Sequence, residues 1–227
     1  IIGQAKTGTG KTLGFGLPIL NNVKRGNGKA VALVVVPTRE LCIQVAEELN
    51  KLAGGLELRV TAIYGGRPME PQIAELKKGI DIVVGTPGRL LDLHRQRALD
   101  LSEVKHLVLD EADEMLDLGF MPDVEKIFTL TSTRAQTMLF SATMPGDIIA
   151  LARRFMNQPV HIRAANLEDE GAVVSRIEQH VIRAHAMDKT ELLARILQAD
   201  KRGPTIVFCR TKRTAQKTAD DLVERGF

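Results

Sequence analysis

A glycine-rich loop near the start of the chain constrains its fold more than any other feature. Residues 5–12 read AKTGTGKT and match the pattern G-x-x-x-x-G-K-[ST], except that Ala5 stands in place of the first glycine. In this pattern the backbone N–H groups of the turn bind phosphate oxygens, the lysine reaches the outer phosphates, and the final hydroxyl holds Mg²⁺. A strand before the loop and a helix over residues 13–20 are therefore expected. The candidate nucleotide-binding residues are Ala5, Lys6, Thr7, Gly8, Thr9, Gly10, Lys11 and Thr12.

A second cluster supplies carboxylates. Residues 110–113, Asp-Glu-Ala-Asp, directly follow the apolar run 106–109 and so lie where a strand is expected to end. Carboxylates at this point can provide the remaining metal and water chemistry of phosphoryl transfer. Together the two clusters predict hydrolysis of a nucleoside triphosphate, with Mg²⁺ as the metal.

The composition narrows the class of protein. At 227 residues, 44% hydrophobic and 26% charged, the chain resembles an ordinary soluble globular protein, and it has no apolar run long enough for a membrane span. Cys42 and Cys209 lie far apart and predict reduced core thiols in a cytoplasmic protein. None of the five histidines is assigned a role in catalysis or metal binding.

Charge and aromatic content bear on nucleic-acid binding. The net charge of +3 permits a polyanionic partner without requiring one. With one tyrosine and no tryptophan, a base-stacking platform is not expected. A nucleic acid would therefore be held by its backbone.

Short apolar runs alternate with helical patterns along most of the chain. The runs at 31–36, 58–63, 80–84, 107–109 and 137–140 are mostly continuous, which is typical of strands buried on both faces of a parallel sheet. Helices are expected between them, for example over 39–53, with N-caps at Thr38 and at Thr86 before Pro87. The fold class is α/β, a parallel sheet flanked by helices.

Polar clusters follow these runs at once, as in PTREL after 31–36, GGR after 61–64, TPGR after 82–84 and SAT after 138–140. Since parallel strands share one carboxyl edge, these clusters should gather beside the phosphate loop. An extended binding surface next to the nucleotide is predicted.

The pattern changes near the C-terminal end. We expect a last strand of the first domain at 159–164, then strands at 176–184 and 205–208 and helices at 187–201 and 211–225. The predicted organisation is a first domain over 1–165, a linker over 166–175 and part of a second domain over 176–227.

In order and approximate spacing, the motifs AKTGTGKT, PTREL, GG, TPGR, DEAD and SAT resemble those of the DEAD-box RNA helicases of bacterial type. The later segment IVFCRTK resembles the opening motif of that family's second RecA-like domain. The resemblance implies a P-loop NTPase (RecA-like) domain and the start of a second one. It also implies a fragment, because the family's adenine-reading Gln stretch and later second-domain motifs are absent.

The resemblance assigns roles in ATP chemistry. It implies that Lys11 contacts the outer phosphates, that Thr12 and Asp110 hold Mg²⁺, and that Glu111 activates the attacking water, so the catalytic residues are Lys11, Asp110 and Glu111. It also implies that Asp113, Ser141 and Thr143 couple the nucleotide state to domain closure. The alternative for Ser141 and Thr143 is a helix N-cap.

For RNA, the resemblance implies sequence-independent contacts to the backbone. The residues are Pro37, Thr38, Arg39, Gly65, Gly66, Thr86, Gly88 and Arg89. We expect Arg67 to be a solvated surface charge. The basic cluster Arg210, Lys212, Arg213 and Lys217 fits a solvated helix face and an RNA-facing patch equally well.

The predicted function is an ATP-dependent RNA helicase that separates short duplexes. One alternative is an ATP-gated RNA clamp or scaffold subunit with little unwinding of its own. Another is a P-loop ATPase that acts on duplex DNA or drives transport, against which the PTREL, TPGR and SAT clusters argue. Ribonucleoprotein or RNA-decay partners are expected to bind through termini outside this sequence.

Overall fold

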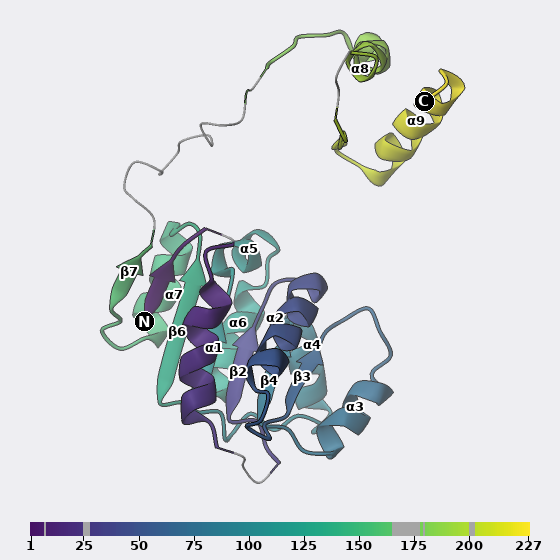
Figure 1. The fold of residues 1–227 in the computed structure, drawn as a ribbon. Coiled ribbons are helices and arrows are strands. Elements are labelled where there is room, and N and C mark those ends of the chain that lie inside the picture. The colour runs from purple at the N-terminus through teal and green to yellow at the C-terminus, as the bar shows by residue number, and fades with distance from the viewer. Residues whose placement is uncertain (7, 25–27, 165–177, 179, 200–202) are drawn as a thin grey trace. The chain divides into compact units, whose positions relative to one another are not determined.

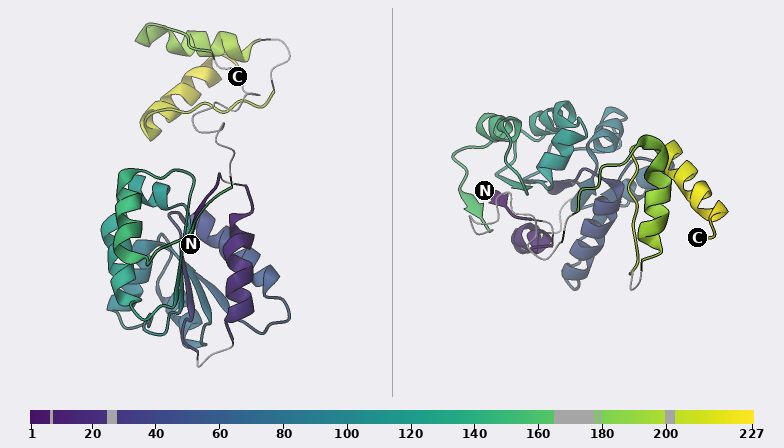
Figure 2. Two further views of the ribbon diagram at one scale, coloured as in Figure 1. Left: turned by 90° about the vertical axis from the view of Figure 1, so that its left-hand side faces the viewer. Right: turned by 90° about the horizontal axis from the view of Figure 1, so that it is seen from above.

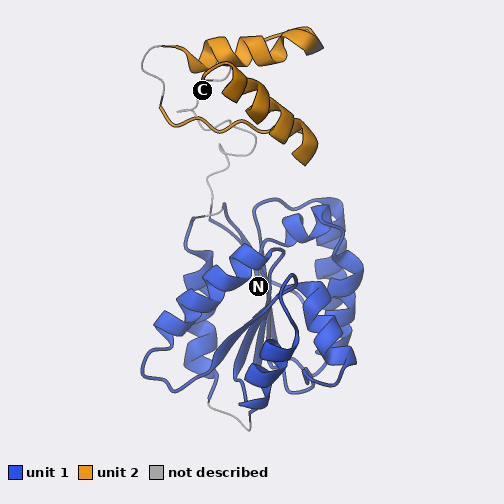
Figure 3. Ribbon diagram, turned by 90° about the vertical axis from the view of Figure 1, so that its right-hand side faces the viewer, with its two compact units in different colours: residues 1–170 blue, residues 171–227 orange. Residues whose placement is uncertain are grey.

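The computed structural model describes residues 1–227 except 7, 25–27, 165–177, 179 and 200–202. The chain divides into two compact units, Ile1–Glu170 and Gly171–Phe227, which Figure 3 shows in different colours. The expected linker, 166–175, lies outside the described residues. The expected domain limits stay a prediction.

The first unit is built on a seven-stranded sheet in the order β3-β4-β2-β5-β6-β1-β7 (Figure 1). Every recorded strand pair is parallel. The strands are β1 (Ile2–Gln4), β2 (Ala32–Val35), β3 (Val60–Ile63), β4 (Ile82–Gly85), β5 (His106–Leu109), β6 (Gln136–Ser141) and β7 (His161–Arg163). The predicted α/β fold with a parallel sheet is confirmed.

Helices cover both faces of this sheet, which explains the continuous apolar runs. Along β2, Leu33 and Val35 pack into one core with α4 (Pro87–Arg95), α5 (Ala112–Asp117), α6 (Met121–Leu130) and α7 (Gly146–Phe155). Ala32 and Val34 pack into the other core, with α1 (Lys11–Asn22) and α2 (Arg39–Leu52). The left panel of Figure 2 shows α1 on one side of the sheet and the teal helices on the other. Successive side chains of β2 thus point to opposite faces of the sheet, and helices shield both faces from water.

Two helix starts, at Thr38 and Thr86, and a helix over residues 13–20 were expected from sequence. Thr38 caps α2, because its Oγ1 accepts a hydrogen bond from Leu41 N at 3.3 Å. Thr86 precedes Pro87 at the start of α4, but its side chain makes no capping hydrogen bond. Helix α1 forms despite Gly14, Gly16 and Pro18, and Gly16 lets α2 approach closely: a Cβ there would lie 2.8 Å from Leu49 Cδ2. Tertiary packing outweighs the weak helix propensity.

The second unit contains the short 3₁₀ helix η2 (Ala186–Asp188), α8 (Lys189–Leu197) and α9 (Lys212–Glu224). The two predicted helices are confirmed with narrower limits. The predicted strand at 205–208 is wrong, since these residues form no strand and Phe208 is 92% exposed. The strand predicted at 176–184 is also wrong for 178 and 180–184, while 176, 177 and 179 lie outside the described residues. A strand needs a neighbour to receive its backbone hydrogen bonds, and the described part of this unit offers none.

The carboxyl edge of the sheet falls into two halves, as the strand order requires. Strands β5, β6 and β1 are neighbours, so the phosphate loop, the acidic turn and the SAT cluster lie together in what we call the acidic half. Strands β3, β4 and β2 are also neighbours. Their ends carry the GG, TPGR and PTREL clusters, in what we call the arginine half. The remaining helix, α3 (Glu70–Lys77), follows β3.

Candidate functional site

The phosphate loop joins β1 to α1 and is shaped by two glycines. Gly8 and Gly10 have φ angles of 82° and 83°, in the left-handed region that favours glycine. Thr9 Oγ1 donates to Lys6 O at 2.7 Å, and Gly14 N donates to Gly10 O at 3.1 Å to open the helix. The first turn of α1 contains no acidic residue. Of the predicted loop residues, Thr7 lies outside the described part of the chain.

Lys11 and Asp110 form the charged centre of the acidic half. Lys11 Nζ lies 3.7 Å from Asp110 Oδ1, and their side chains are only 7% and 4% exposed. Asp110 Oδ1 also accepts a hydrogen bond from Glu111 N at 2.9 Å. Burial raises the pKa of Asp110 to about 6, although the charge of Lys11 opposes this rise. The ionised carboxylate is therefore held at a free-energy cost, which a cationic ligand would offset.

These residues fit a phosphate and a divalent cation. Lys11 Nζ is buried and makes no hydrogen bond to any described residue, so it retains its donors for an anion. Within the described ranges no three His, Cys, Asp or Glu side chains gather as metal ligands. Mg²⁺ characteristically takes one or two carboxylates together with substrate phosphates and water, and Asp110 beside the start of α1 suits that mode. Thr12, the other predicted ligand, lies half-buried in the first turn of α1.

Glu111 occupies a strained turn beside this centre. Its backbone is left-handed, with φ 53° and ψ 52°, an uncommon conformation for a residue with a side chain. A cleft of 180 Å³ opens here, lined by Lys11, Glu111, Asp113, Glu114, Asp117 and Ala142. The cleft brings the predicted phosphate ligand and the predicted base together.

Glu114 is a member of this cleft that sequence reasoning missed. A hydrogen bond with Glu111, followed by burial and the neighbouring carboxylates, raises the pKa of Glu114 to about 7. Glu114 lies three residues after Glu111, which directly precedes α5, and this spacing could have indicated the contact.

The SAT cluster holds the start of α5. Asp113 N donates to Ser141 Oγ at 3.2 Å, and Thr143 donates to Asp113 Oδ2 from both its backbone N (2.9 Å) and its Oγ1 (2.8 Å). Burial opposes ionisation of Asp113, but the hydrogen bonds from Thr143 outweigh it and lower the pKa. Helix α7 begins after Pro145, so Ser141 and Thr143 do not cap it. Ser141 instead binds a backbone N–H group in the first turn of α5.

The arginine half brings the predicted polyanion-binding clusters together. Pro37 is buried, Thr38 caps α2, and Arg39 is exposed at the first turn of that helix. Thr86 N donates to Ile63 O at 3.0 Å, which ties the start of α4 to the strand before Gly65. The remaining predicted positions, Gly65, Gly66, Gly88 and Arg89, are exposed or half-buried.

Two residues of this half were not predicted to matter. Tyr64 is the only tyrosine of the chain, and the guanidinium groups of Arg39 and Arg67 both lie over its ring. Arg67 is exposed, as expected, yet it is bound to Tyr64 rather than simply solvated. The only sequence signal was the position of both residues beside Gly65 and Gly66.

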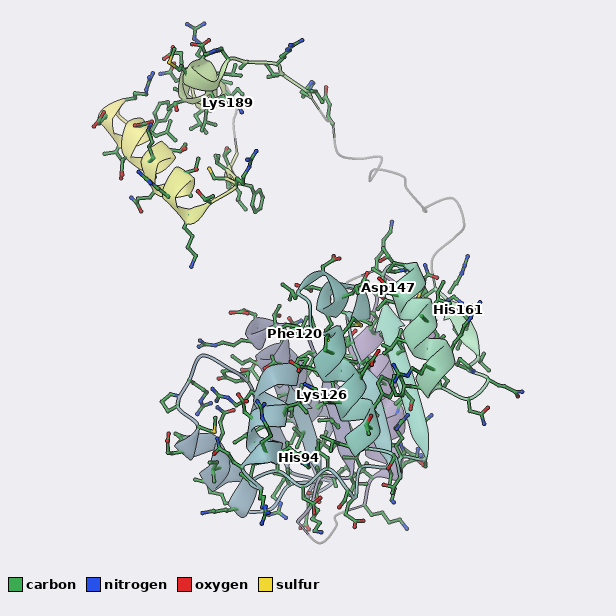
Figure 4. The ribbon with its side chains drawn as sticks, turned by 180° about the vertical axis from the view of Figure 1, so that it is seen from behind. His94, Phe120, Lys126, Asp147, His161 and Lys189 are labelled. Carbon is green, nitrogen blue, oxygen red and sulfur yellow. The ribbon has the colours of Figure 1, made fainter. Side chains whose placement is uncertain are left out.

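The cysteines and histidines make local contacts. Cys42 is buried as expected, and burial raises the pKa of its thiol to about 12. Cys209 is partly exposed, so its assignment as a core thiol is wrong, because the segment around it is not covered by a sheet. Two histidines are labelled in Figure 4. His94 Nδ1 lies 3.1 Å from Leu99 O, and His161 Nε2 lies 3.2 Å from Gln4 Oε1. In the second unit, Arg210, Lys212, Arg213 and Lys217 are exposed.

Regarding membranes, no helix in the described part of the chain has the length and apolar character needed to cross a bilayer.

Comparison with known proteins places this geometry in a family. The sequence model of the DEAD/DEAH box helicases matches residues 1–151. The DEAD-box ATP-dependent RNA helicase CshA of Geobacillus kaustophilus is 46% identical over 227 residues, which cover 100% of this chain and 48% of that protein. The chain thus spans about half the length of the curated relatives it matches.

Solved structures agree. A DEAD box protein from the hyperthermophile Methanococcus jannaschii is 42% identical, with a TM-score of 0.69 over 100% of this chain and 60% of that one. The yeast DEAD-box splicing factor Prp28 is 31% identical, with a TM-score of 0.70 over 99% of this chain and 53% of that one. The resemblance read from the motifs is confirmed, and the chain belongs to the DEAD/DEAH box helicase family.

Proposed function

We propose that the chain is the nucleotide-binding part of an ATP-dependent RNA helicase, which separates short RNA duplexes while hydrolysing ATP. The observation that carries the proposal is Lys11, whose buried ammonium group lies beside Asp110 with no hydrogen bond to a described residue. A buried cation of this kind at the start of a helix suits the outer phosphates of a nucleotide. Relatives that match the whole chain are named ATP-dependent RNA helicases, which supports the choice of ATP and RNA.

In this proposal each residue of the acidic half has one task. Backbone N–H groups of residues 5–12 bind the phosphates, and Lys11 contacts the outermost ones. Thr12 and Asp110 would hold Mg²⁺, and the bound ion would neutralise charge on the phosphates. Glu111 orients a water molecule and takes its proton as the water oxygen attacks the γ-phosphorus and ADP leaves.

Asp113, Ser141 and Thr143 transmit the nucleotide state. Their hydrogen bonds tie the turn that carries Glu111 to the end of β6. A change in the contacts of Glu111 near the γ-phosphate would therefore alter the hydrogen bonds of the SAT cluster.

The arginine half binds the RNA backbone without reading its sequence. Pro37, Thr38, Gly65, Gly66, Thr86 and Gly88 let phosphates approach the main chain, and Arg39 and Arg89 supply charge. The compartment we propose is the cytoplasm, and the partner is RNA.

The test is a Glu111→Gln variant of the full-length protein. RNA-stimulated phosphate release should fall by about 10²–10⁴-fold, because the amide cannot accept the proton of the attacking water. Binding of ATP and RNA should persist, and a closed complex should accumulate. Glu47→Gln, at an exposed position of α2, is the matched control and should keep the parental rate.

Two outcomes bear on the proposal differently. A parental rate in the Glu111 variant would show that another group activates the water. If the unsubstituted protein hydrolyses ATP and binds RNA but does not separate duplexes, the activity is that of an RNA clamp.

A further inference from the structure

Tyr64 gathers two cations at the end of β3. The guanidinium carbons of Arg39 and Arg67 lie 5.4 Å and 5.5 Å from the centre of its ring, within the range of cation–π attraction. Arg67 Nη1 also donates to Tyr64 Oη at 3.3 Å. Because both distances share the ring centre, the two guanidinium carbons lie no more than about 11 Å apart. Tyr64 as a whole is 7% exposed, so its ring serves as a support and not as a free stacking surface.

Arg89 joins this pair from the next connection. Its Nη1 and Nη2 both donate to Arg67 O, each at 3.1 Å. Arginines from the ends of β2, β3 and β4 thus meet at one place, as expected from the adjacency of these strands in Figure 1. Each arginine belongs to a different cluster: Arg39 to PTREL, Arg67 to GGR and Arg89 to TPGR.

Among the described residues, no carboxylate forms an ion pair with these three arginines. Other arginines, such as Arg95 and Arg154, pair with acidic side chains. Like charges at this spacing repel one another, and an anion between them would remove the repulsion. Guanidinium groups are suited to phosphate because of their flat, multiple donors.

Gln72 fixes the turn that carries Arg67. Its side chain is buried, accepts from Tyr64 N at 3.0 Å, and donates to Tyr64 O at 3.2 Å and to Pro68 O at 3.1 Å. These bonds hold the main chain on both sides of Gly65 and Gly66. Gly66 has φ 78°, and Arg39 Nη1 lies 3.9 Å from the place where its Cβ would be. The turn is therefore set before any ligand arrives.

We infer that Arg67 adds a phosphate contact to the RNA surface that Arg39 and Arg89 already form, and that Tyr64 positions Arg67 for this contact. The inference rests on the proposed function, because it names how the arginine half holds RNA. Arg67 is thereby a binding residue, and Tyr64 and Gln72 are positioning residues.

The experiment measures RNA affinity of the full-length protein by fluorescence anisotropy with a labelled 12-nucleotide polyuridylate at several salt concentrations. Arg67→Ala should weaken binding about tenfold near 0.1 M salt and lower the slope of log K against log salt by about 0.7, the value for one phosphate contact on a single strand. Arg67→Lys should recover part of the loss. Arg95→Ala, which removes the same charge from the last turn of α4, should change affinity less than twofold.

The role of Tyr64 is tested without changing any charge. Tyr64→Leu should weaken RNA binding about fivefold and lower the salt slope, because Arg67 is no longer held in place. Tyr64→Phe keeps the ring and should stay within about threefold of the parent. Thermal melting and affinity for a fluorescent ATP analogue verify that each variant is folded.

The outcomes separate this inference from the proposed function. If Arg67→Ala behaves like Arg95→Ala while Arg89→Ala weakens binding, the inference is wrong and the RNA surface stands. If Arg89→Ala also has no effect, the RNA surface itself is wrong. If Arg67→Ala weakens binding but Tyr64→Leu does not, Tyr64 has no positioning role.

Discussion

The two halves of the sheet edge differ in how their charged groups meet water. At the ends of β1, β5 and β6, the ammonium group of Lys11 and the carboxylate of Asp110 are buried beside each other. At the ends of β2, β3 and β4, the arginine side chains are largely open to solvent, and two of them lie over one aromatic ring. Lys11 and Asp110 are almost wholly withdrawn from water. Arg39 and Arg67 remain exposed, and Tyr64 lies between the strand end and their guanidinium groups. The same sheet edge thus presents two electrostatic environments.

The difference concerns selectivity. A buried charge is costly unless a ligand replaces the lost water, so the acidic half should accept only a compact ligand with matching charges. Exposed arginines keep most of their hydration and are screened by salt, so they should hold many polyanions with modest affinity. One half can therefore recognise a nucleotide while the other holds a chain of any sequence.

The largest predicted effect is that of Lys11→Ala, which tests whether the halves act independently. ATP turnover by the full-length protein should fall by at least about 10³-fold, because the outer phosphates lose their buried cationic contact. Affinity for RNA in the absence of nucleotide should stay within twofold of the parent. A parallel loss of nucleotide-free RNA binding would show that the two halves are not separate sites.

A middle-sized effect is predicted for the link between the acidic turn and β6. Asp113→Asn should lower the free energy of unfolding of the first unit by about 1–2 kcal/mol, since hydrogen bonds to a charged acceptor are replaced by weaker ones. In the 227-residue chain, tyrosine fluorescence during urea unfolding reports on this unit, because Tyr64 is the only tyrosine of that sequence. Glu47→Gln, at an exposed position of α2, is the control and should leave the free energy of unfolding nearly unchanged.

This link should also depend on pH. The pKa of Asp113 is lowered from 3.8 in the folded state, so its contribution to stability is complete above that value and is lost as the pH falls below it. The difference in stability between the parent and the Asn variant should therefore shrink on acidification below about pH 4. A constant difference from pH 6 to pH 3 would contradict the role given to the carboxylate.

The smallest effects come from a matched pair of glycines, one in each half. Gly8 and Gly66 have φ angles of 82° and 78°, so alanine at either position is strained by about 1–2 kcal/mol. Gly8→Ala should weaken nucleotide binding several-fold and leave RNA binding unchanged, and Gly66→Ala should do the reverse. Each variant is titrated once with nucleotide and once with RNA. If Gly8→Ala weakened RNA binding, or Gly66→Ala weakened nucleotide binding, the two halves would not be separate sites.

Most of the fold follows from local pattern. The apolar runs around Val34, Val84 and Val108 predicted the central strands because both faces of the sheet are covered. The run at 205–208 has the same pattern, yet it forms no strand among the described residues of its unit. An apolar run predicts burial only where a neighbouring strand and a covering helix exist.

The candidate site was predictable where its residues lie close in sequence. Lys11, Asp110 and Glu111 belong to contiguous motifs, whereas the support of Arg39 by Tyr64 crosses from one strand end to another. Gln72 was missed because nothing in an eight-residue helix shows that one amide is turned inward. The contact between Arg39 and Tyr64 arises from the strand order, which the sequence alone did not reveal.

Ser141 joins two segments of the acidic half at a single residue. Its carbonyl accepts a hydrogen bond from Ala5 N at 3.1 Å, and its hydroxyl accepts one from Asp113 N at 3.2 Å. The start of the phosphate loop and the first turn of α5 are thus bound to the same residue, one through its backbone and the other through its side chain. A displacement of the loop relative to the acidic turn would therefore have to break one of these two hydrogen bonds or move both segments together.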